Sequence, residues 1–171
     1  MKILILNGSP RANGNTKALT AAFAKGAQSV GHEVVEYQVG RMDINACLAC
    51  EYCHGKGDGA CIQKDEMQTI YPELATADVV VIASPVHYFG LSGQMESTLA
   101  RFYAPFRPKA NKYAMILSSG SPNVFAGTEG QYKSMLAFFQ AEDLGIMEVI
   151  GDDNKSEAAL AKLEAFGASI Q

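Results

Sequence analysis

Four closely spaced cysteines are the residues of this sequence best suited to binding a metal centre. Cys47, Cys50 and Cys53 follow one another at intervals of three residues. Cys61 comes after a further seven residues, three of which are glycine. Three thiolates at this spacing can converge in one compact turn, and the glycine-rich span allows the fourth to fold back toward them. The set could ligate a [4Fe–4S] cluster.

Two other interpretations fit the same cysteines. A zinc ion could be bound by all four thiolates, or by three of them together with His54. Alternatively, the thiols could be free and reduced in an active-site loop, or Cys47 and Cys50 could form a disulfide.

A second group of polar residues follows an apolar run near the start of the sequence. Residues 3–6 are consecutive apolar residues without alternation, which predicts a parallel strand buried on both faces. A helix begins near Gly14. The loop between them offers hydroxyl, amide and guanidinium groups in Ser9, Arg11, Gly14, Asn15 and Thr16. Because the backbone N–H groups of a helix N-terminus favour anions, this loop is a candidate phosphate site.

The loop differs from the two commonest nucleotide-binding patterns. Five residues separate Gly8 from Gly14, and Asn15 and Thr16 follow, whereas a P-loop has four residues between its glycines and then Lys-Ser/Thr. The pattern G-x-G-x-x-G is also absent, which disfavours NAD as a resident cofactor. An ordinary turn would explain Asn, Gly and Ser, but it would not need so many donors.

Two further loops follow strong strand patterns. Residues 78–84 (DVVVIAS) precede a short segment with three consecutive ring-bearing residues, which favours a planar ligand. The candidate residues of this segment are Pro85, Val86, His87, Tyr88 and Phe89. Small residues follow the next predicted strand and would allow backbone groups to approach a flat ligand; they are Ser118, Ser119 and Gly120.

Strand and helix patterns alternate along the whole chain, which predicts an α/β fold. These elements position the three loops. The predicted strands are residues 3–6, 32–39, 78–84, 112–118 and 146–150. The predicted helices are residues 17–31, 64–77, 92–103, 130–144 and 156–169. With right-handed crossovers, they form a doubly wound, flavodoxin-like five-stranded parallel sheet of order 2-1-3-4-5, with helices on both faces. The loops after strands 1, 3 and 4 then meet beside a crevice at the carboxyl ends of the strands.

Length and composition favour one domain over residues 1–171, with a cysteine-rich loop at about 45–63. A net charge of −4 argues against a nucleic-acid partner. No apolar stretch approaches the roughly 20 residues of a membrane span. We therefore expect a cytoplasmic protein with reduced or metal-bound thiols.

The first loop, NGSPRANGNT, resembles that of the flavodoxin-like NAD(P)H-dependent FMN oxidoreductases, whose usual form is GSPR followed by a glycine and Asn-Thr. That family binds the FMN phosphate in this loop. The resemblance implies Ser9, Arg11, Asn15 and Thr16 as phosphate ligands, with Gly14 permitting close approach.

The segment SPVHYFGLSGQMESTLAR resembles the same family's second loop and following helix. It implies that the loop lines the ribityl chain and the edge of the isoalloxazine ring, with the residues after strand 4 near the pyrimidine edge. Three positions differ from the usual family residues: His87 replaces Tyr, Glu96 replaces Lys and Ala100 replaces Asp. The family's flavin face is often completed by a neighbouring subunit, which implies a homodimer or homotetramer.

The cysteine spacing is similar to that of the iron–sulfur flavoprotein branch of this family. That branch carries C-x₂-C-x₂-C-x₄₋₇-C between strand 2 and helix 2, and Cys47, Cys50, Cys53 and Cys61 match its longest form. The resemblance implies a [4Fe–4S] cluster, although relatives with a similar segment and no cluster also occur. The following residues 63–67 (QKDEM) also resemble the family, which usually has DDM.

The resemblance implies an FMN-dependent NAD(P)H oxidoreductase in which reduced nicotinamide passes hydride to FMN. A quinone, a nitro compound or free flavin would then accept the electrons. His87 is the candidate catalytic residue, as a donor to the flavin or a group titrating near neutral pH. It could equally be a packed ring without a chemical role.

Two other functions fit the sequence. One is a one-electron carrier that binds FMN, with or without a [4Fe–4S] cluster, and serves redox-protein partners. The other is a zinc-stabilised binding module of flavodoxin fold. An apolar stripe on the predicted helix 92–103 suits a core or a subunit contact, and its members are Met95, Leu99, Phe102 and Phe106.

Overall fold

A parallel five-stranded sheet forms the centre of the computed structural model, which describes residues 1–105 and 107–171. The strands are β1 (Lys2–Asn7), β2 (Glu33–Tyr37), β3 (Val79–Pro85), β4 (Lys112–Ser119) and β5 (Glu142–Ile150). Their order is β2-β1-β3-β4-β5, and every neighbouring pair is parallel. This is the flavodoxin-like order predicted from the sequence.

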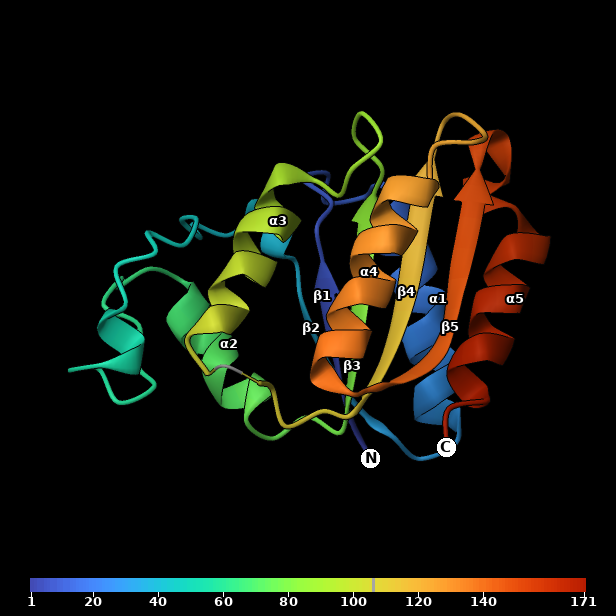
Figure 1. Cartoon of the computed structure of the whole chain (residues 1–171). Helices are drawn as coiled ribbons and strands as arrows, with labels where there is room; N and C mark the ends of the chain where they lie inside the picture. The colour runs from blue at the N-terminus through green and yellow to red at the C-terminus, as the bar shows by residue number, and fades with distance from the viewer. Residues whose placement is uncertain (106) are drawn as a thin grey trace.

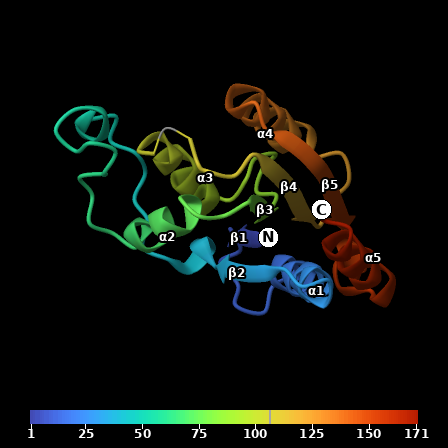
Figure 2. The same cartoon turned by 90° about the horizontal axis from the view of Figure 1, so that it is seen from below.

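Helices cover both faces of the sheet (Figures 1 and 2). On one face lie α1 (Asn15–Ser29) and α5 (Glu157–Ala168). On the other lie α2 (Met67–Leu74), α3 (Gly93–Ala100) and α4 (Ala126–Phe139). Short 3₁₀ turns occupy Val39–Arg41, Tyr52–His54, Arg101–Tyr103 and Gly151–Lys155. Within the described residues, no helix combines the length and apolarity needed to cross a membrane.

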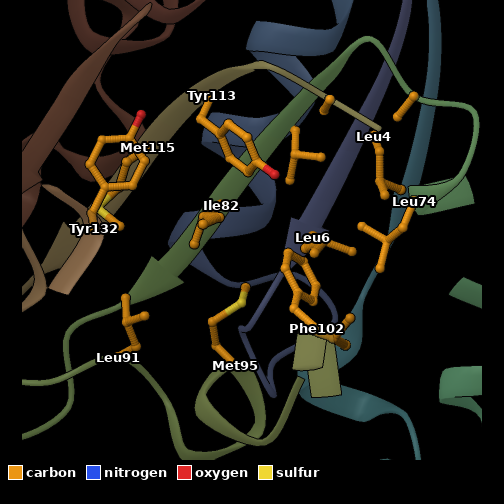
Figure 3. Close-up of a cluster of buried hydrophobic side chains, with 14 of the residues drawn as sticks. Leu4, Leu6, Leu74, Ile82, Leu91, Met95, Phe102, Tyr113, Met115 and Tyr132 are labelled. Carbon is orange, nitrogen blue, oxygen red and sulfur yellow. The ribbon is translucent and has the colours of Figure 1, made fainter. Parts of the chain in front are cut away.

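The three central strands are buried on both faces, as their unbroken apolar runs predict. Leu4, Ile82 and Met115 pack with α3 residues such as Met95 in the cluster of Figure 3. The alternate residues of the same strands, such as Ile5, pack on the opposite face against α1 and α5. Burying each such side chain contributes about 1.5–3 kcal/mol.

Two helix boundaries correct the sequence-based prediction. The predicted helix 130–144 is instead α4, which begins at Ala126 and ends at Phe139, and Glu142 already belongs to β5. Gln140 has a left-handed backbone (φ 55°) that ends the helix, and the Glu142 N–H then bonds the Asn111 carbonyl beside β4. Pairing with a neighbouring strand therefore overrides the local helical pattern.

The second boundary concerns helix 64–77, which is shortened to α2, Met67–Leu74. The Asp65 side chain accepts from the Met67 N–H at 3.2 Å and also pairs with Arg101, so the helix begins only at Met67. Phe106, the last member of the predicted apolar stripe, lies outside the described residues. Of the other members, Met95 and Phe102 are buried in the core and Leu99 is partly buried against it.

The helix that follows the first loop is held by close contact with α5. A Cβ on Gly26 of α1 would overlap the backbone oxygen of Glu164, and a Cβ on Gly167 of α5 would overlap that of Phe23. Phe23 and Phe166 add an edge-to-face contact with ring centroids 5.5 Å apart. Glycine at both crossing points therefore allows the two backbones to approach.

We predict that Gly26→Ala lowers the free energy of unfolding by about 1–3 kcal/mol, because the added methyl forces these two helices apart. Gly130→Ala is the matched control, since a Cβ at Gly130 in α4 meets no other atom within 4 Å. That control should be neutral or stabilising, by up to about 1 kcal/mol. Urea unfolding of both variants measures the effect, and equal stability of the two would contradict the close packing of α1 on α5.

Candidate functional site

A hollow of about 340 Å³ lies at the carboxyl ends of the central strands. Three loops supply its walls: those after β1, β3 and β4. Its lining residues are Ser9, Pro10, Arg11, Gly14, Asn15, Thr16, Pro85, Val86, His87, Ser118, Ser119 and Gly120. The structure thus brings together every candidate loop residue predicted from the sequence except Tyr88 and Phe89.

The loop after β1 is braced from behind by polar side chains. The Ser9 N–H donates to Asn7 Oδ1 at 3.0 Å. Gln38 Nε2 donates to the backbone oxygens of Ser9 at 3.1 Å and Arg11 at 2.9 Å. A Cβ on Gly40 would overlap the Ser9 backbone, so this glycine lets the chain after β2 pack directly against the loop. These contacts fix the loop before any ligand binds.

The start of α1 has the features of an anion site. Gly14 is the N-cap residue, and no side chain in the described part of the chain caps this end. The first-turn N–H groups and the helix dipole therefore favour a negative group there. Thr16 Oγ1 lies 2.8 Å from Ser118 Oγ, and both side chains are buried at the base of the hollow. A Cβ on Gly14 would lie 2.8 Å from Ser9 Oγ, so glycine keeps this approach open.

The loop after β3 is a tight hairpin that carries two aromatic rings away from the hollow. His87 and Gly90 exchange both backbone hydrogen bonds, at 2.9 and 3.1 Å. Tyr88 and Phe89 form the turn with φ of 49° and 69° and are 97% and 57% exposed. Pro85, Val86 and His87 line the hollow, whereas these two rings do not. The Phe89 carbonyl packs against Gly127, where a Cβ would lie 2.5 Å from it.

The loop after β4 is tied to the other loops and to the segment before α5. The Val86 N–H donates to the Ser118 oxygen at 2.8 Å, which joins the second and third loops. The buried Asn154 donates through Nδ2 to the Ser119 oxygen at 2.9 Å. Asn7, Gln38 and Asn154 were not predicted as site residues. Their only signal in the sequence is the position of Asn7 at the end of an apolar strand.

The four cysteines line a second, smaller hollow together with Arg101 and Tyr103. All four are free thiols; Cys53 is buried, and Cys50 is exposed. Burial raises the pKa of the Cys53 thiol. Within the described residues, no three His, Cys, Asp or Glu side chains are grouped closely enough to hold a metal ion.

A buried ion pair lies beside this second hollow. Arg101 donates through Nη1 to Asp65 Oδ2 at 2.6 Å and through Nη2 to Asp65 Oδ1 at 3.2 Å, and the two side chains are 1% and 4% exposed. Burial alone would raise the pKa of Asp65, but hydrogen bonds from Arg101 and the Asn45 N–H outweigh it and lower the pKa. Burial also raises the pKa of Tyr71, which donates to the Arg101 carbonyl, to about 12.

The thiols of this hollow lie too far apart in this structure to share one metal ion, but its residue types fit an iron–sulfur cluster in two respects. Four thiols are the donor set that such clusters use. In addition, Arg101 Nε is buried and has no hydrogen-bond partner within the described part of the chain. A buried donor without a partner costs about 1–3 kcal/mol, and a bound sulfur atom would provide the acceptor. Asp65 and Arg101 belong to two sequence segments that were noted separately, and their pairing was not predicted.

Solved structures with the same architecture define the fold class. RosB with a bound 8-demethyl-8-formylriboflavin-5'-phosphate intermediate has a TM-score of 0.79 at 15% identity, over 99% of this chain and 76% of that one. An NAD(P)H:quinone oxidoreductase from Methanothermobacter marburgensis has a TM-score of 0.74 at 16% identity, over 100% and 99%. These similarities and the strand order establish the flavodoxin-like fold class.

The family follows from the sequence itself. The model of the family described as NADPH-dependent FMN reductase matches residues 1–153, and the chain therefore belongs to that family.

The chain is also similar to archaeal iron–sulfur flavoproteins. One, from Methanocaldococcus jannaschii, is 39% identical over 101 residues, which are 59% of this chain and 50% of that protein. The chain therefore spans about half the length of this relative. Another, from Methanosarcina thermophila, is 26% identical over 157 residues, which are 90% of this chain and 79% of that protein.

We predict that Asp65→Asn lowers the free energy of unfolding by about 3–5 kcal/mol at neutral pH, because Arg101 then keeps a buried charge without its counterion. The lowered pKa of Asp65 means that the ion pair contributes fully above the ordinary carboxyl pKa of 3.8. Its contribution is lost as the pH falls through the lower, folded-state value. The stability difference from the unmodified protein should therefore shrink on acidification.

Denaturant unfolding between about pH 7 and pH 3 measures this difference, because this range spans the ordinary carboxyl pKa of about 4. Asp58→Asn provides the control, because Asp58 is an exposed carboxylate in the same cysteine-containing segment. A constant stability difference for Asp65→Asn down to the lowest pH would show that its carboxylate is not the group that stabilises the fold.

Proposed function

We propose that the chain is an FMN-dependent NAD(P)H oxidoreductase that passes reducing equivalents from reduced nicotinamide, through bound FMN, to a small acceptor. The observation that carries the proposal is the three-loop hollow, which combines an uncapped helix N-terminus with buried hydroxyls and small residues. This chemistry suits a ligand with an anionic group at one end and a flat ring at the other. Membership of the FMN reductase family supports the same ligand.

In this proposal each loop has its own role. Ser9, Arg11, Asn15 and Thr16 bind the FMN phosphate together with the first N–H groups of α1, and Gly14 leaves room for it. Pro85, Val86 and His87 contact the ribityl chain and the ring. Ser118, Ser119 and Gly120 face the pyrimidine edge, where small side chains expose backbone donors and acceptors.

Bound FMN would supply the hydride chemistry, and the chain would orient it and tune its electronic properties. His87 is the proposed donor of a hydrogen bond to the ring, since it lines the hollow and its backbone is fixed by Gly90. Tyr88 and Phe89 lie at the hairpin tip and outside the hollow lining. If they contact the flavin or its acceptor, they do so from the rim.

Quinones, nitro compounds and free flavin are the proposed acceptors. The structural likeness to a quinone oxidoreductase, and to an FMN-dependent NADH-azoreductase from Bacillus anthracis with a TM-score of 0.72 at 14% identity, supports the fold alone. The proposal of a flat, reducible acceptor therefore rests on the shape of the hollow and on flavin chemistry.

A second candidate function is electron transfer to redox proteins through FMN and a [4Fe–4S] cluster on Cys47, Cys50, Cys53 and Cys61. The shared hollow of the four thiols favours it, and so do the relatives that are named iron–sulfur flavoproteins. Together, the two groups would convert two-electron input from hydride at FMN into single-electron output through the cluster.

Assembly and compartment are also proposals. We propose a homodimer or homotetramer, since Tyr88 and Phe89 are exposed beside the hollow and a second subunit could cover them. We propose the reducing cytoplasm as the compartment, because the four cysteines form no disulfide and structural disulfides are rare there.

Anaerobic purification, followed by flavin, iron, sulfide and zinc analysis and by NADH and NADPH oxidation assays, tests the two candidates. We expect about one FMN per chain, since the hollow is a single site of suitable volume. We also expect oxidation of NADH or NADPH with a quinone or nitro acceptor. Failure to oxidise either nicotinamide, with rapid electron exchange with ferredoxin, would replace the enzyme by the electron carrier. A chain that binds zinc and no flavin would contradict both.

We predict that Thr16→Ala weakens FMN binding by about 1 kcal/mol or more, because it removes one hydrogen bond to a charged phosphate. Thr69→Ala is the control, since the Thr69 hydroxyl lies on α2 and donates to the Glu66 carbonyl, away from the hollow. Fluorescence titration of the flavin-free protein with FMN, and in parallel with riboflavin, measures the loss. An equal loss for the two ligands would mean that Thr16 does not bind the phosphate.

A further inference from the structure

The segment that carries the four cysteines is fastened at both of its ends by Arg101. Residues 46–64 extend away from the sheet beyond α2 and α3 (Figures 1 and 2). Arg101 Nη1 donates to the backbone oxygen of Asn45 at 2.9 Å, just before the segment, and its guanidinium pairs with Asp65, just after it. The Asp65 carboxylate closes the loop by accepting from the Asn45 N–H at 3.0 Å.

The same side chain borders the thiols. Arg101 lines the hollow formed by Cys47, Cys50, Cys53 and Cys61, and it is almost fully buried. Two of its nitrogens are used by the contacts at the segment ends, whereas Nε has no partner among the residues that the structure describes. The Asp65 carboxylate balances the guanidinium charge, so one fixed donor, Nε, remains for a ligand of the thiols.

We propose that Arg101 is a positioning residue for the iron–sulfur cluster, a role that rests on the cluster assignment of the proposed function. By joining the two ends of the segment, it keeps the four cysteines at the lining of one hollow, and their thiols come within ligating distance of one another when the cluster binds. Through Nε it donates a hydrogen bond to a sulfur atom of the bound cluster. Hydrogen bonds to sulfur favour the reduced cluster, so the Nε donor of Arg101 raises the reduction potential.

A purely structural ion pair would account for the contacts with Asn45 and Asp65. It would not account for the position of Arg101 beside all four thiols or for its unpaired Nε. The experiment must therefore separate the fastening of the segment from the effect on the cluster.

The fastening is tested in cluster-free protein by the rate at which iodoacetamide alkylates Cys53, which is buried. Asp65→Asn breaks the ion pair, and Arg101→Lys keeps the positive charge but removes the two-pronged contact. Lys64→Gln is the control, because it removes an exposed cation next to Asp65. We expect alkylation about tenfold faster in the first two variants and unchanged in the third, because a loosened segment opens locally more often. Unchanged alkylation in Arg101→Lys, folded and able to bind FMN, would overturn the fastening role.

The effect on the cluster is tested after anaerobic reconstitution with Fe²⁺ and sulfide. In Arg101→Lys we expect iron loss to a chelator to be about 10- to 100-fold faster than in the unmodified protein. We also expect a more negative cluster potential in a redox titration followed by electron paramagnetic resonance, with FMN affinity and flavin potential unchanged. Lys64→Gln should match the unmodified protein throughout.

The outcomes separate this role from the proposed function. If the unmodified protein takes up iron and sulfide and Arg101→Lys shows the same iron loss and the same potential, the role of Arg101 is refuted and the cluster stands. If the unmodified protein takes up neither, the cluster assignment and the role of Arg101 toward it are both refuted, while the FMN site is unaffected.

Discussion

The parallel register of β1, β3 and β4 is the constraint on which the rest of the structure depends. These strands are buried on both faces, so their backbone groups must be satisfied by the neighbouring strands of the sheet. The register pairs Asn7 with Ala83 and Pro85 with Ser118, which brings the carboxyl ends of the three strands together. The crossover helices α1 and α3 leave toward opposite faces (Figure 2). A hollow between the three loops is the geometric result.

The rigidity of that hollow comes from polar residues that stand behind it. Asn7, Gln38 and Asn154 satisfy backbone groups of the loops from outside the hollow lining. The hairpin tip at Tyr88 and Phe89 has the opposite character, since left-handed backbone at such bulky residues costs about 1–2 kcal/mol each. Its short turn is held instead by the backbone pair of His87 with Gly90.

The sequence predicted most of the fold and most of the hollow because both depend on local patterns. Unbroken apolar runs identify buried strands, and a glycine-rich turn before a helix identifies an anion site. What it missed depends on contacts distant in sequence. The end of α4 is decided by the following strand, β5, which pairs with β4. The rings of Tyr88 and Phe89 leave the hollow because both residues of a two-residue turn have positive φ. Asp65 and Arg101 are 36 residues apart, and neither local segment contains a signal that they pair.

Helix α3 connects the two candidate sites mechanically. At its start, Ser92 caps the helix by accepting from the Met95 N–H and donates to the Gly8 oxygen at 2.7 Å, in the loop proposed to bind phosphate. At its end, Arg101 holds both ends of the cysteine segment. The eight residues of α3 rise about 12 Å along the helix axis. The core side of this helix is packed against β1 and β3, so one rigid element sets the separation between the two sites. Neither site can therefore shift toward the other without moving α3 out of the core.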